Sequence, residues 1–287
     1  MKIGFIGLGN MGQGMADNLL NKGADLMVFT RSLEKISAMK KRGAKGASSI
    51  EEISKETDLI FTCLPNVETS IQIVKGIKNY SNDVKSVSDH STVSLKTSIE
   101  SHRLLNENGI SFLDAPISGG PVGAKDGTLS IMVGGELDDY TRALPYYKMM
   151  GSTVKHIGKT GTGTAMKLIN QLLTAVHTTA AAEAISLANA VGITINDAME
   201  ILSVSFGNSK MLERSAPIIR DKTYTESLAP ARNLNKDIHI ITELANDLNL
   251  NLPLIKSTKV LFDEYKNIGK EMEDIAGIIQ LFEMNKE

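Results

Sequence analysis

The first half of the chain alternates short apolar runs with longer stretches of helical periodicity. The apolar runs predict strands near 2–7, 25–30, 58–63, 85–89, 111–116, 129–134 and 153–157. Helical patterns lie between most of them, near 11–22, 33–42, 50–56, 67–78, 95–108 and 137–149. Strands that alternate with helices are typical of βαβ units, so we expect an α/β fold with a mainly parallel, doubly wound sheet.

The pattern changes after Gly163. Residues 163–191 read as one helical run rich in alanine, leucine and threonine. Further helical stretches follow at 195–204, 209–220, 232–249, 254–267 and 273–284. The glycine-rich segment "GKTGTG" (158–163) lies at the change. We therefore predict two domains, an α/β domain over 1–161 and an all-helical domain over 162–287.

Composition excludes several classes of protein. The chain has 287 residues, of which 42% are hydrophobic and 22% charged, and its formal net charge is −2, so no overall positive charge attracts nucleic acid or an anionic membrane. No stretch approaches the ~20 apolar residues of a membrane span. The chain opens directly into the strand pattern "MKIGFIG" without a signal peptide, so we expect a cytoplasmic protein.

Cysteine and histidine usage argues against a metal site. The single cysteine, Cys63, excludes an internal disulfide framework and a cysteine-rich zinc site, and we expect it to be an inert core thiol. The five histidines show no metal-ligand spacing. We therefore assign no metal.

A glycine-rich turn follows the first predicted strand. Gly7, Gly9 and Gly12 form the pattern G-x-G-x-x-G, between that strand and an amphipathic helix. Such glycines permit a tight turn, close approach of the backbone to a pyrophosphate, and close packing of helix on strand. A structural glycine turn is the alternative. We predict a dinucleotide site of the Rossmann type, whose pyrophosphate loop is Gly7, Leu8, Gly9, Asn10, Met11 and Gly12.

Thr30, Arg31 and Ser32 end the second predicted strand, where an NAD site usually offers an acid to the ribose 2′-hydroxyl. An acid there would repel a 2′-phosphate, whereas arginine offers it a planar fork of donors and the hydroxyls add two more. A solvated surface arginine is the alternative. We expect NADP(H) to be preferred, with NAD(H) as the other cofactor.

Two further features carry candidate chemistry. The segment "LDAPISGGPVGAKDGTLSIMVGG" (113–135) contains Ser118, Gly119 and Gly120, a backbone that can approach an anion closely. Lys167, in "GTGTAMKLINQLL", is surrounded by apolar residues, although burying an ammonium is costly unless it is paired or loses its proton. On these residues alone, the loop could be a simple connection and the lysine could be ion-paired or snorkelling.

Six segments, in this order and spacing, resemble the β-hydroxyacid dehydrogenase family over essentially the whole chain. They are "GFIGLGNMG", "CLPN" (63–66), "DHSTVS" (89–94), "DAPISGGPVGAKDGTL" (114–129), "GTGTAMKLIN" (161–170) and "NKD" (235–237). The family includes 3-hydroxyisobutyrate dehydrogenases and glyoxylate/succinic semialdehyde reductases. The resemblance implies a small carboxylate-bearing substrate and a homodimer or homotetramer.

The resemblance also implies residue roles. Lys167 is the expected catalytic residue, giving a proton to the carbonyl oxygen in reduction and removing it in oxidation; a water-poor pocket would lower its pKa from ~10.4. Ser118, Gly119 and Gly120 are expected to hold the substrate carboxylate. The cofactor residues implied are Leu64, Pro65, Thr69, Thr92 and Lys236.

The sequence departs from the family pattern at two places. Relatives commonly have asparagine four residues after the lysine, where this chain has Gln171, and Asn170 stands one position earlier. We keep both as candidate substrate-binding residues. Ala229 occupies a position where relatives often place an aromatic residue that closes the substrate pocket. Arg232 lies nearby, with a surface charge as its alternative, and Phe206 is a candidate to fill the gap.

Three other functions are compatible with parts of the pattern. A decarboxylating sugar-phosphate dehydrogenase would need a longer helical part and an acid about two turns beyond the lysine, where Thr174 stands. An imine reductase-like enzyme shares the architecture but usually lacks the lysine. A non-catalytic NADP-binding interaction protein would have lost the lysine, which this chain retains.

Overall fold

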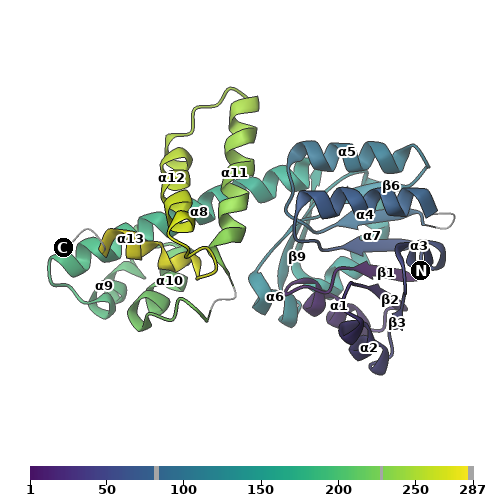
Figure 1. Ribbon diagram of the computed structural model, residues 1–287, viewed down its shortest axis with the longest axis horizontal. Coiled ribbons are helices and arrows are strands. Elements are labelled where there is room, and N and C mark those ends of the chain that lie inside the picture. The colour runs from purple at the N-terminus through teal and green to yellow at the C-terminus, as the bar shows by residue number, and fades with distance from the viewer. Residues whose placement is uncertain (81–83, 227–228, 284–287) are drawn as a thin grey trace. The chain divides into compact units, whose positions relative to one another are not determined.

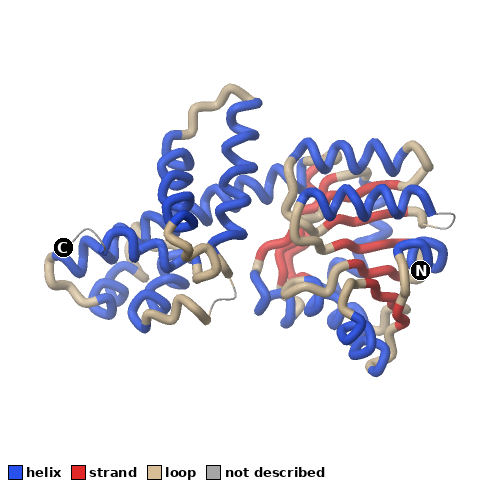
Figure 2. Tube along the Cα trace, viewed as in Figure 1, coloured by secondary structure: helices blue, strands red, loops and turns tan. Residues whose placement is uncertain are grey.

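A computed structural model describes residues 1–80, 84–226 and 229–283. The chain divides into two compact units, Met1–Lys167 and Leu168–Glu287. The first unit has a sheet with helices, whereas the described residues of the second form helices and no strand (Figures 1 and 2). The predicted fold class is confirmed.

A nine-stranded sheet lies at the centre of the first unit. Its strands are β1 (Ile3–Ile6), β2 (Leu26–Phe29), β3 (Lys45–Gly46), β4 (Leu59–Thr62), β5 (Ser86–Asp89), β6 (Ser111–Asp114), β7 (Ile117–Ser118), β8 (Leu129–Gly134) and β9 (Gly151–Gly158). Their order is β3-β2-β1-β4-β5-β6-β8-β7, with β9 paired to β8. All pairs from β3 to β6 are parallel, whereas β8 runs antiparallel to β6 and β7.

The strands are apolar on both faces because helices cover both sides of the sheet. Successive residues of a strand point to opposite faces. Accordingly, Ile3 and Phe5 of β1 belong to one buried cluster, whereas Ile6 belongs to another. Continuous apolar runs of this kind are what a parallel sheet with two covered faces requires.

The helices of the first unit form two groups. On one face, α1 (Gly12–Asn21) packs against α6 (Gly120–Asp126) and α7 (Leu137–Met150). On the other, α4 (Val67–Tyr80) lies between α3 (Ile50–Glu56) and α5 (Leu95–Asn106), and Figure 1 shows α4 and α5 side by side. The remaining helix, α2 (Leu33–Lys41), packs against β2 and β3.

Residues 113–135 differ from the expected glycine-rich connection between two strands. They contain the short strand β7 and the helix α6. The helix begins with Gly120 and Pro121 and includes Gly123, and glycine and proline have low helix propensity. Proline is tolerated here because it stands in the first turn. The two-residue strand β3 was also not predicted, since it is too short to show a period.

The second unit is built on α8 (Thr162–Ala190), which begins in the first unit. The other helices are α9 (Ile195–Leu202), α10 (Lys210–Asp221), α11 (Ala231–Asp247), α12 (Pro253–Asn267), the 3₁₀ helix η1 (Ile275–Ile279) and α13 (Gln280–Glu283). The stretch predicted as one helix over 273–284 is therefore a 3₁₀ turn followed by a short helix, and residue 284 lies outside the described residues. Asp274 caps the 3₁₀ turn and is held by both guanidinium ends of Arg214.

Candidate active site

The turn between β1 and α1 has the shape of an anion-binding loop. Gly7 has a φ of +102°, and a Cβ on Gly12 would overlap the Gly7 carbonyl, so both positions require glycine. A Cβ on Gly9 would meet no atom within 4 Å, so the loop is open at that point. The N-cap of α1, Met11, makes no side-chain cap, and the first turn has no acid. The loop and helix N-terminus therefore fit a pyrophosphate.

Thr30, Arg31 and Ser32 connect β2 to α2. Arg31 is exposed, and the Ser32 hydroxyl caps α2 by accepting the Lys35 N–H at 3.4 Å. The Lys35 ammonium donates to the Leu8 carbonyl of the glycine loop at 2.7 Å. Lys35 thus links the first turn of α2 to the glycine loop and adds a cation to this region. The sequence analysis did not identify Lys35. Its position in the first turn of the helix that follows "TRS" is the feature that could have indicated it.

A buried carboxylate links two loops that were expected near the nicotinamide. Asp89, at the end of β5, accepts from the Thr62 hydroxyl at 2.8 Å and from the Ser91 hydroxyl at 2.5 Å. The Ser91 oxygen in turn accepts the Leu64 N–H at 2.8 Å. Burial raises the pKa of Asp89, and these hydrogen bonds oppose that effect. The other expected residues here are Pro65, which is exposed, and Thr69 and Thr92, which are half-buried.

The expected carboxylate-binding residues stand where β7 ends and α6 begins. Ser118 is half-buried and ends the strand. Gly119, with a φ of +134°, is the N-cap of α6, and Gly120, with a φ of +64°, is its first residue. The helix start has no side-chain cap and no acid in its first turn. Its backbone N–H groups can therefore donate to a carboxylate.

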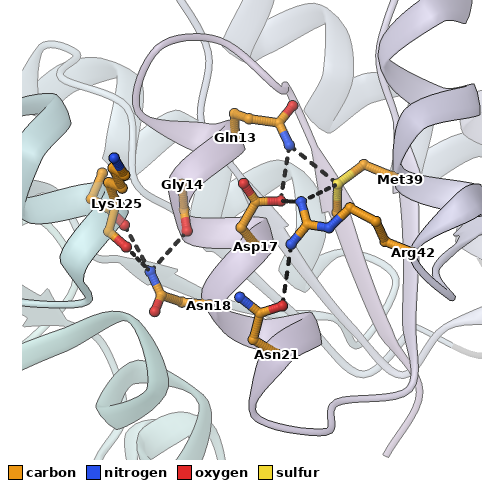
Figure 3. A network of polar contacts seen from close by, with 9 residues as sticks. Gln13, Gly14, Asp17, Asn18, Asn21, Met39, Arg42 and Lys125 are labelled. Atoms are coloured by element: carbon orange, nitrogen blue, oxygen red, sulfur yellow. Dashed lines mark hydrogen bonds and ion pairs between the residues drawn. The ribbon is translucent and has the colours of Figure 1, made fainter.

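Helix α1, which follows the glycine loop at residues 7–12, is joined directly to α6. The Asn18 amide nitrogen donates to the carbonyl oxygens of Ala124 at 2.8 Å and Lys125 at 3.0 Å. Figure 3 shows the Asn18 side chain of α1 directed towards Lys125 of α6. On another side of α1, Asp17 pairs with Arg42 at the end of α2. The helices that follow the two candidate anion-binding loops are therefore connected by hydrogen bonds within the α/β unit.

Lys167 lies in the second turn of α8 and is only 7% exposed. The start of this helix is anchored on the sheet, because the N–H groups of Gly161 and Thr164 donate to the Asp114 carboxylate, each at 2.7 Å. A buried ammonium on an anchored helix has the fixed position that an acid/base group needs.

Three expected residues meet in the helical unit. The Gln171 amide nitrogen donates to Asp237 Oδ2 at 2.6 Å, and the Lys236 ammonium lies 2.9 Å from Asp237 Oδ1. Asn170 donates to the Gln171 amide oxygen at 3.1 Å. Asp237, which is 4% exposed, therefore connects the candidate substrate residues with the candidate cofactor lysine. Its role was not predicted, although it completes the quoted "NKD".

The residues considered for closing the substrate pocket are half-buried or exposed. Arg232 is exposed, and its backbone N–H donates to the Glu271 carbonyl at 2.8 Å. Ala229 is half-buried, and its carbonyl accepts the Ile275 N–H at 3.2 Å. The Phe206 side chain is fully exposed. The helical unit by itself therefore gives neither Arg232 nor Phe206 a packing role.

Cys63, expected as a core thiol, is half-buried and lies beside the glycine loop, because a Cβ on Gly7 would overlap its carbonyl oxygen. Burial, together with the nearby Asp89 carboxylate, raises the pKa of the Cys63 thiol to about 12. A hydrogen bond from the Gly12 N–H lowers that pKa but does not cancel the effect. The thiol is therefore protonated at neutral pH and is a poor nucleophile.

Neither a metal cluster nor a membrane span is found within 1–80, 84–226 and 229–283. These residues contain no group of three or more histidine, cysteine, aspartate or glutamate side chains that could hold a metal ion. None of their helices is long and apolar enough to cross a membrane.

Comparisons with known proteins agree over the whole chain. The model of the NAD-binding domain of 6-phosphogluconate dehydrogenase matches residues 2–158, and that of the NAD-binding domain of NADP-dependent 3-hydroxyisobutyrate dehydrogenase matches residues 161–282. The chain is 31% identical to 2-(hydroxymethyl)glutarate dehydrogenase of Eubacterium barkeri, over 99% of this chain and 95% of that protein. It is also 31% identical to glyoxylate/succinic semialdehyde reductase 2, chloroplastic, of Arabidopsis thaliana, over 100% of this chain and 80% of that protein.

A solved structure is similar over nearly the full length. The crystal structure of 3-hydroxyisobutyrate dehydrogenase (ygbJ) from Salmonella typhimurium superposes with a TM-score of 0.89 at 29% identity, covering 98% of this chain and 100% of that one.

Proposed function

Because the chain belongs to the β-hydroxyacid dehydrogenase family, we propose that it interconverts a short β- or γ-hydroxy acid and its semialdehyde, or reduces glyoxylate, with NADP(H). The burial of Lys167 on the anchored start of α8 is the observation that carries this proposal. We assign the pyrophosphate loop, most other cofactor-binding residues and the carboxylate loop at Ser118 to the domain over 1–161. The other substrate-binding residues, Lys236 and the association of protomers are assigned to the domain over 162–287.

The proposed chemistry centres on Lys167. When bound, the nicotinamide supplies or accepts the hydride. In reduction, the Lys167 ammonium stabilises the negative charge that grows on the substrate carbonyl oxygen and gives that oxygen a proton. In oxidation, the neutral amine removes the proton from the substrate hydroxyl.

Other residues would bind and orient the reactants. The Ser118 hydroxyl and the N–H groups of Gly119 and Gly120 hold the substrate carboxylate. Asn170 and Gln171 are the candidates for a second polar group of the substrate. Asp237 keeps Gln171 and Lys236 in place through its two carboxylate oxygens.

The cofactor is proposed to bind along the carboxyl ends of the parallel strands. Residues 7–12 hold the pyrophosphate, and Leu64, Pro65, Thr69, Thr92 and Lys236 contact the remainder. NADP(H) is preferred because Arg31 and Lys35 supply two cations to a 2′-phosphate. NAD(H) would use the same loop without those contacts and is expected to be the poorer cofactor.

Replacing Lys167 by alanine tests the mechanism. Turnover should fall by roughly 10²- to 10⁴-fold, the usual contribution of a positioned acid/base group, while NADPH affinity stays nearly unchanged. The matched control is Lys155→Ala, which removes an exposed lysine from β9 of the same unit. A Lys167→Ala enzyme that keeps most of its activity contradicts the proposal.

The substrate panel for this assay follows from the carboxylate loop. It consists of glyoxylate, succinic semialdehyde, methylmalonate semialdehyde, tartronate semialdehyde and 3-hydroxyisobutyrate, each with both cofactors. Turnover of cyclic imines, with none of these acids, would favour an imine reductase instead. Cofactor binding without turnover of either class would favour a non-catalytic protein.

We also infer that protomers associate as homodimers or homotetramers through the helical unit. The end of α8 and the region of α9 expose large apolar side chains, among them Leu187, Ile201 and Phe206. Such a surface is characteristic of an interface.

A further inference from the structure

Asp114 joins the sheet to the helix that carries Lys167. It ends β6, is 1% exposed, and accepts the Gly161 N–H at Oδ1 and the Thr164 N–H at Oδ2. These donors stand at the start of α8, where backbone N–H groups lack partners within the helix. A side chain 50 residues before Thr164 therefore caps this helix. Burial raises the pKa of Asp114, and the two backbone hydrogen bonds oppose that effect.

Backbone packing at the same point leaves little room for the helix to shift. A Cβ on Gly163 would overlap the carbonyl oxygens of both Asp114 and Met132, so α8 rests directly on the ends of β6 and β8. The Thr164 hydroxyl shares a further hydrogen bond with Ser98 of α5 at 2.8 Å. The first turn of α8 is thus fixed to three elements of the α/β unit.

Lys167 stands one helical turn beyond these contacts. Gly163 and Thr164 precede it by four and three positions, and residues at those spacings lie on the same face of a helix. The face that rests on Asp114 is therefore the face that carries Lys167.

The chain continues from Asp114 to the candidate carboxylate loop. Asp114 and Ser118 both pair with β8 in antiparallel register, and the Pro116 carbonyl between them accepts the Met132 N–H at 3.0 Å. Residues 114–118 thus form one extended segment whose ends lie roughly 13 Å apart, at about 3.3 Å per residue. One end holds the lysine helix and the other end begins the loop at Ser118.

We propose that Asp114 is a positioning residue for Lys167. Its carboxylate fixes the lysine helix relative to the carboxylate loop at Ser118, and it offsets the positive end of α8. The proposal rests on the catalytic role proposed for Lys167. Asparagine at position 114 would keep the size and one acceptor oxygen, but it would lose the second acceptor and the charge.

Asp114→Asn should reduce kcat by roughly 10- to 100-fold, because a misplacement of about 1 Å costs that much, and should leave NADPH affinity unchanged. In the direction of reduction, kcat should begin to fall at a lower pH than in the wild type. Without the Asp114 charge, the positive N-terminus of α8 disfavours the protonated form of Lys167. Hydrogen exchange at the Gly161 and Thr164 amides should become faster. Asp139→Asn is the control; it removes another buried carboxylate of the unit, paired with Arg142, and should change none of these quantities.

Two results would overturn the proposal. In the first, Asp114→Asn keeps the kcat and the pH profile of the wild type, although Lys167→Ala is inactive. The other is a parallel loss of kcat, NADPH affinity and thermal stability, since that indicates general support of the fold. If the role proposed for Lys167 fails, Lys167→Ala keeps most of its turnover; if the proposed function fails, the wild type turns over none of the acids and semialdehydes. The amide exchange at Gly161 and Thr164 still decides, independently of turnover, whether Asp114 anchors α8.

Discussion

Arg31 and Lys35 stand four positions apart at the start of α2, and together they define the cofactor prediction. NADPH should have the higher specificity constant by roughly 10- to 100-fold, the value of a charge-assisted contact to the 2′-phosphate. Replacing Thr30 with Asp and Arg31 with Leu should reverse the preference, since a carboxylate repels the phosphate and accepts from a 2′-hydroxyl. Steady-state kinetics with both cofactors measure the ratio.

The control for this experiment is Lys40→Met, which removes an exposed lysine further along α2. It should leave the NADPH to NADH ratio unchanged. A ratio near one in the unmodified enzyme, or one that favours NADH, contradicts the assignment. Arg31 would then contact a part that both cofactors share, such as the adenine ring.

His90 makes the stability of the α/β unit depend on pH. Its ring is 2% exposed, and Nδ1 donates to the Ala115 carbonyl at 2.6 Å. Burial lowers the pKa of His90 from 6.5 to about 4, although the Ala115 hydrogen bond opposes this effect. Between these two values the unfolded chain binds more protons than the folded one. The stabilisation is therefore complete above pH 6.5 and is lost as the pH falls to about 4.

The pH dependence of unfolding tests this directly. On going from about pH 7.5 to about pH 5, the free energy of unfolding should fall by about 2 kcal/mol more in the wild type than in His90→Asn. Denaturant titrations at both pH values provide the measurement. The buried carboxyls of Asp89 and Asp114 respond alike in both proteins, so they cancel in the difference. Equal changes in the two proteins would rule out a buried neutral histidine.

At the scale of elements, the sequence predicted those whose period is strong and local. β2 extends over Leu26–Phe29 against a predicted 25–30, and α8 over Thr162–Ala190 against 163–191. Helix α6 could not be predicted from its own residues, because glycine and proline weaken the helical pattern. It is held by Asn18, which lies 106 residues before Ala124. The 3₁₀ turn at Ile275–Ile279 likewise depends on a cap, Asp274, that Arg214 holds from α10.

The candidate site divides in the same way. Gly7 and Gly12 could be selected from the spacing of their motif, which has a known chemical role. Lys167 could be selected because its segment resembles the family, since its own neighbours in the sequence left an ion-paired or snorkelling lysine open. The carboxylates that support the site could not, although each lies in a recognised segment. Asp114 illustrates the reason, since its partner Gly161 is 47 residues away and only the folded chain brings the two together. Sequence patterns therefore identify the groups expected to react, and the structure identifies the groups that hold them.

For the molecule as a whole, the exposed apolar side chains of the helical unit indicate how protomers associate. Residues 187–206 include five strongly exposed apolar side chains, namely Leu187 (67%), Val191 (65%), Ile201 (65%), Val204 (84%) and Phe206 (112%). The helix in this region, α9, has no fully buried residue. Monomeric proteins rarely expose a large contiguous apolar patch. A second copy of the chain is the simplest cover for this surface.

Light scattering after size-exclusion chromatography should therefore give a mass at least twice the chain mass of 31.0 kDa at micromolar concentration. Val204→Asp combined with Phe206→Asp should shift the protein towards the monomer, because association would bury unpaired carboxylates. NADPH binding should persist, since the proposed pyrophosphate loop lies in the other unit. The control is Leu137→Asp, which places a charge on an exposed apolar position of α7 and should leave the mass unchanged. A wild-type mass of one chain would contradict the assembly. An unchanged mass in the double variant would exclude Val204 and Phe206 from the interface.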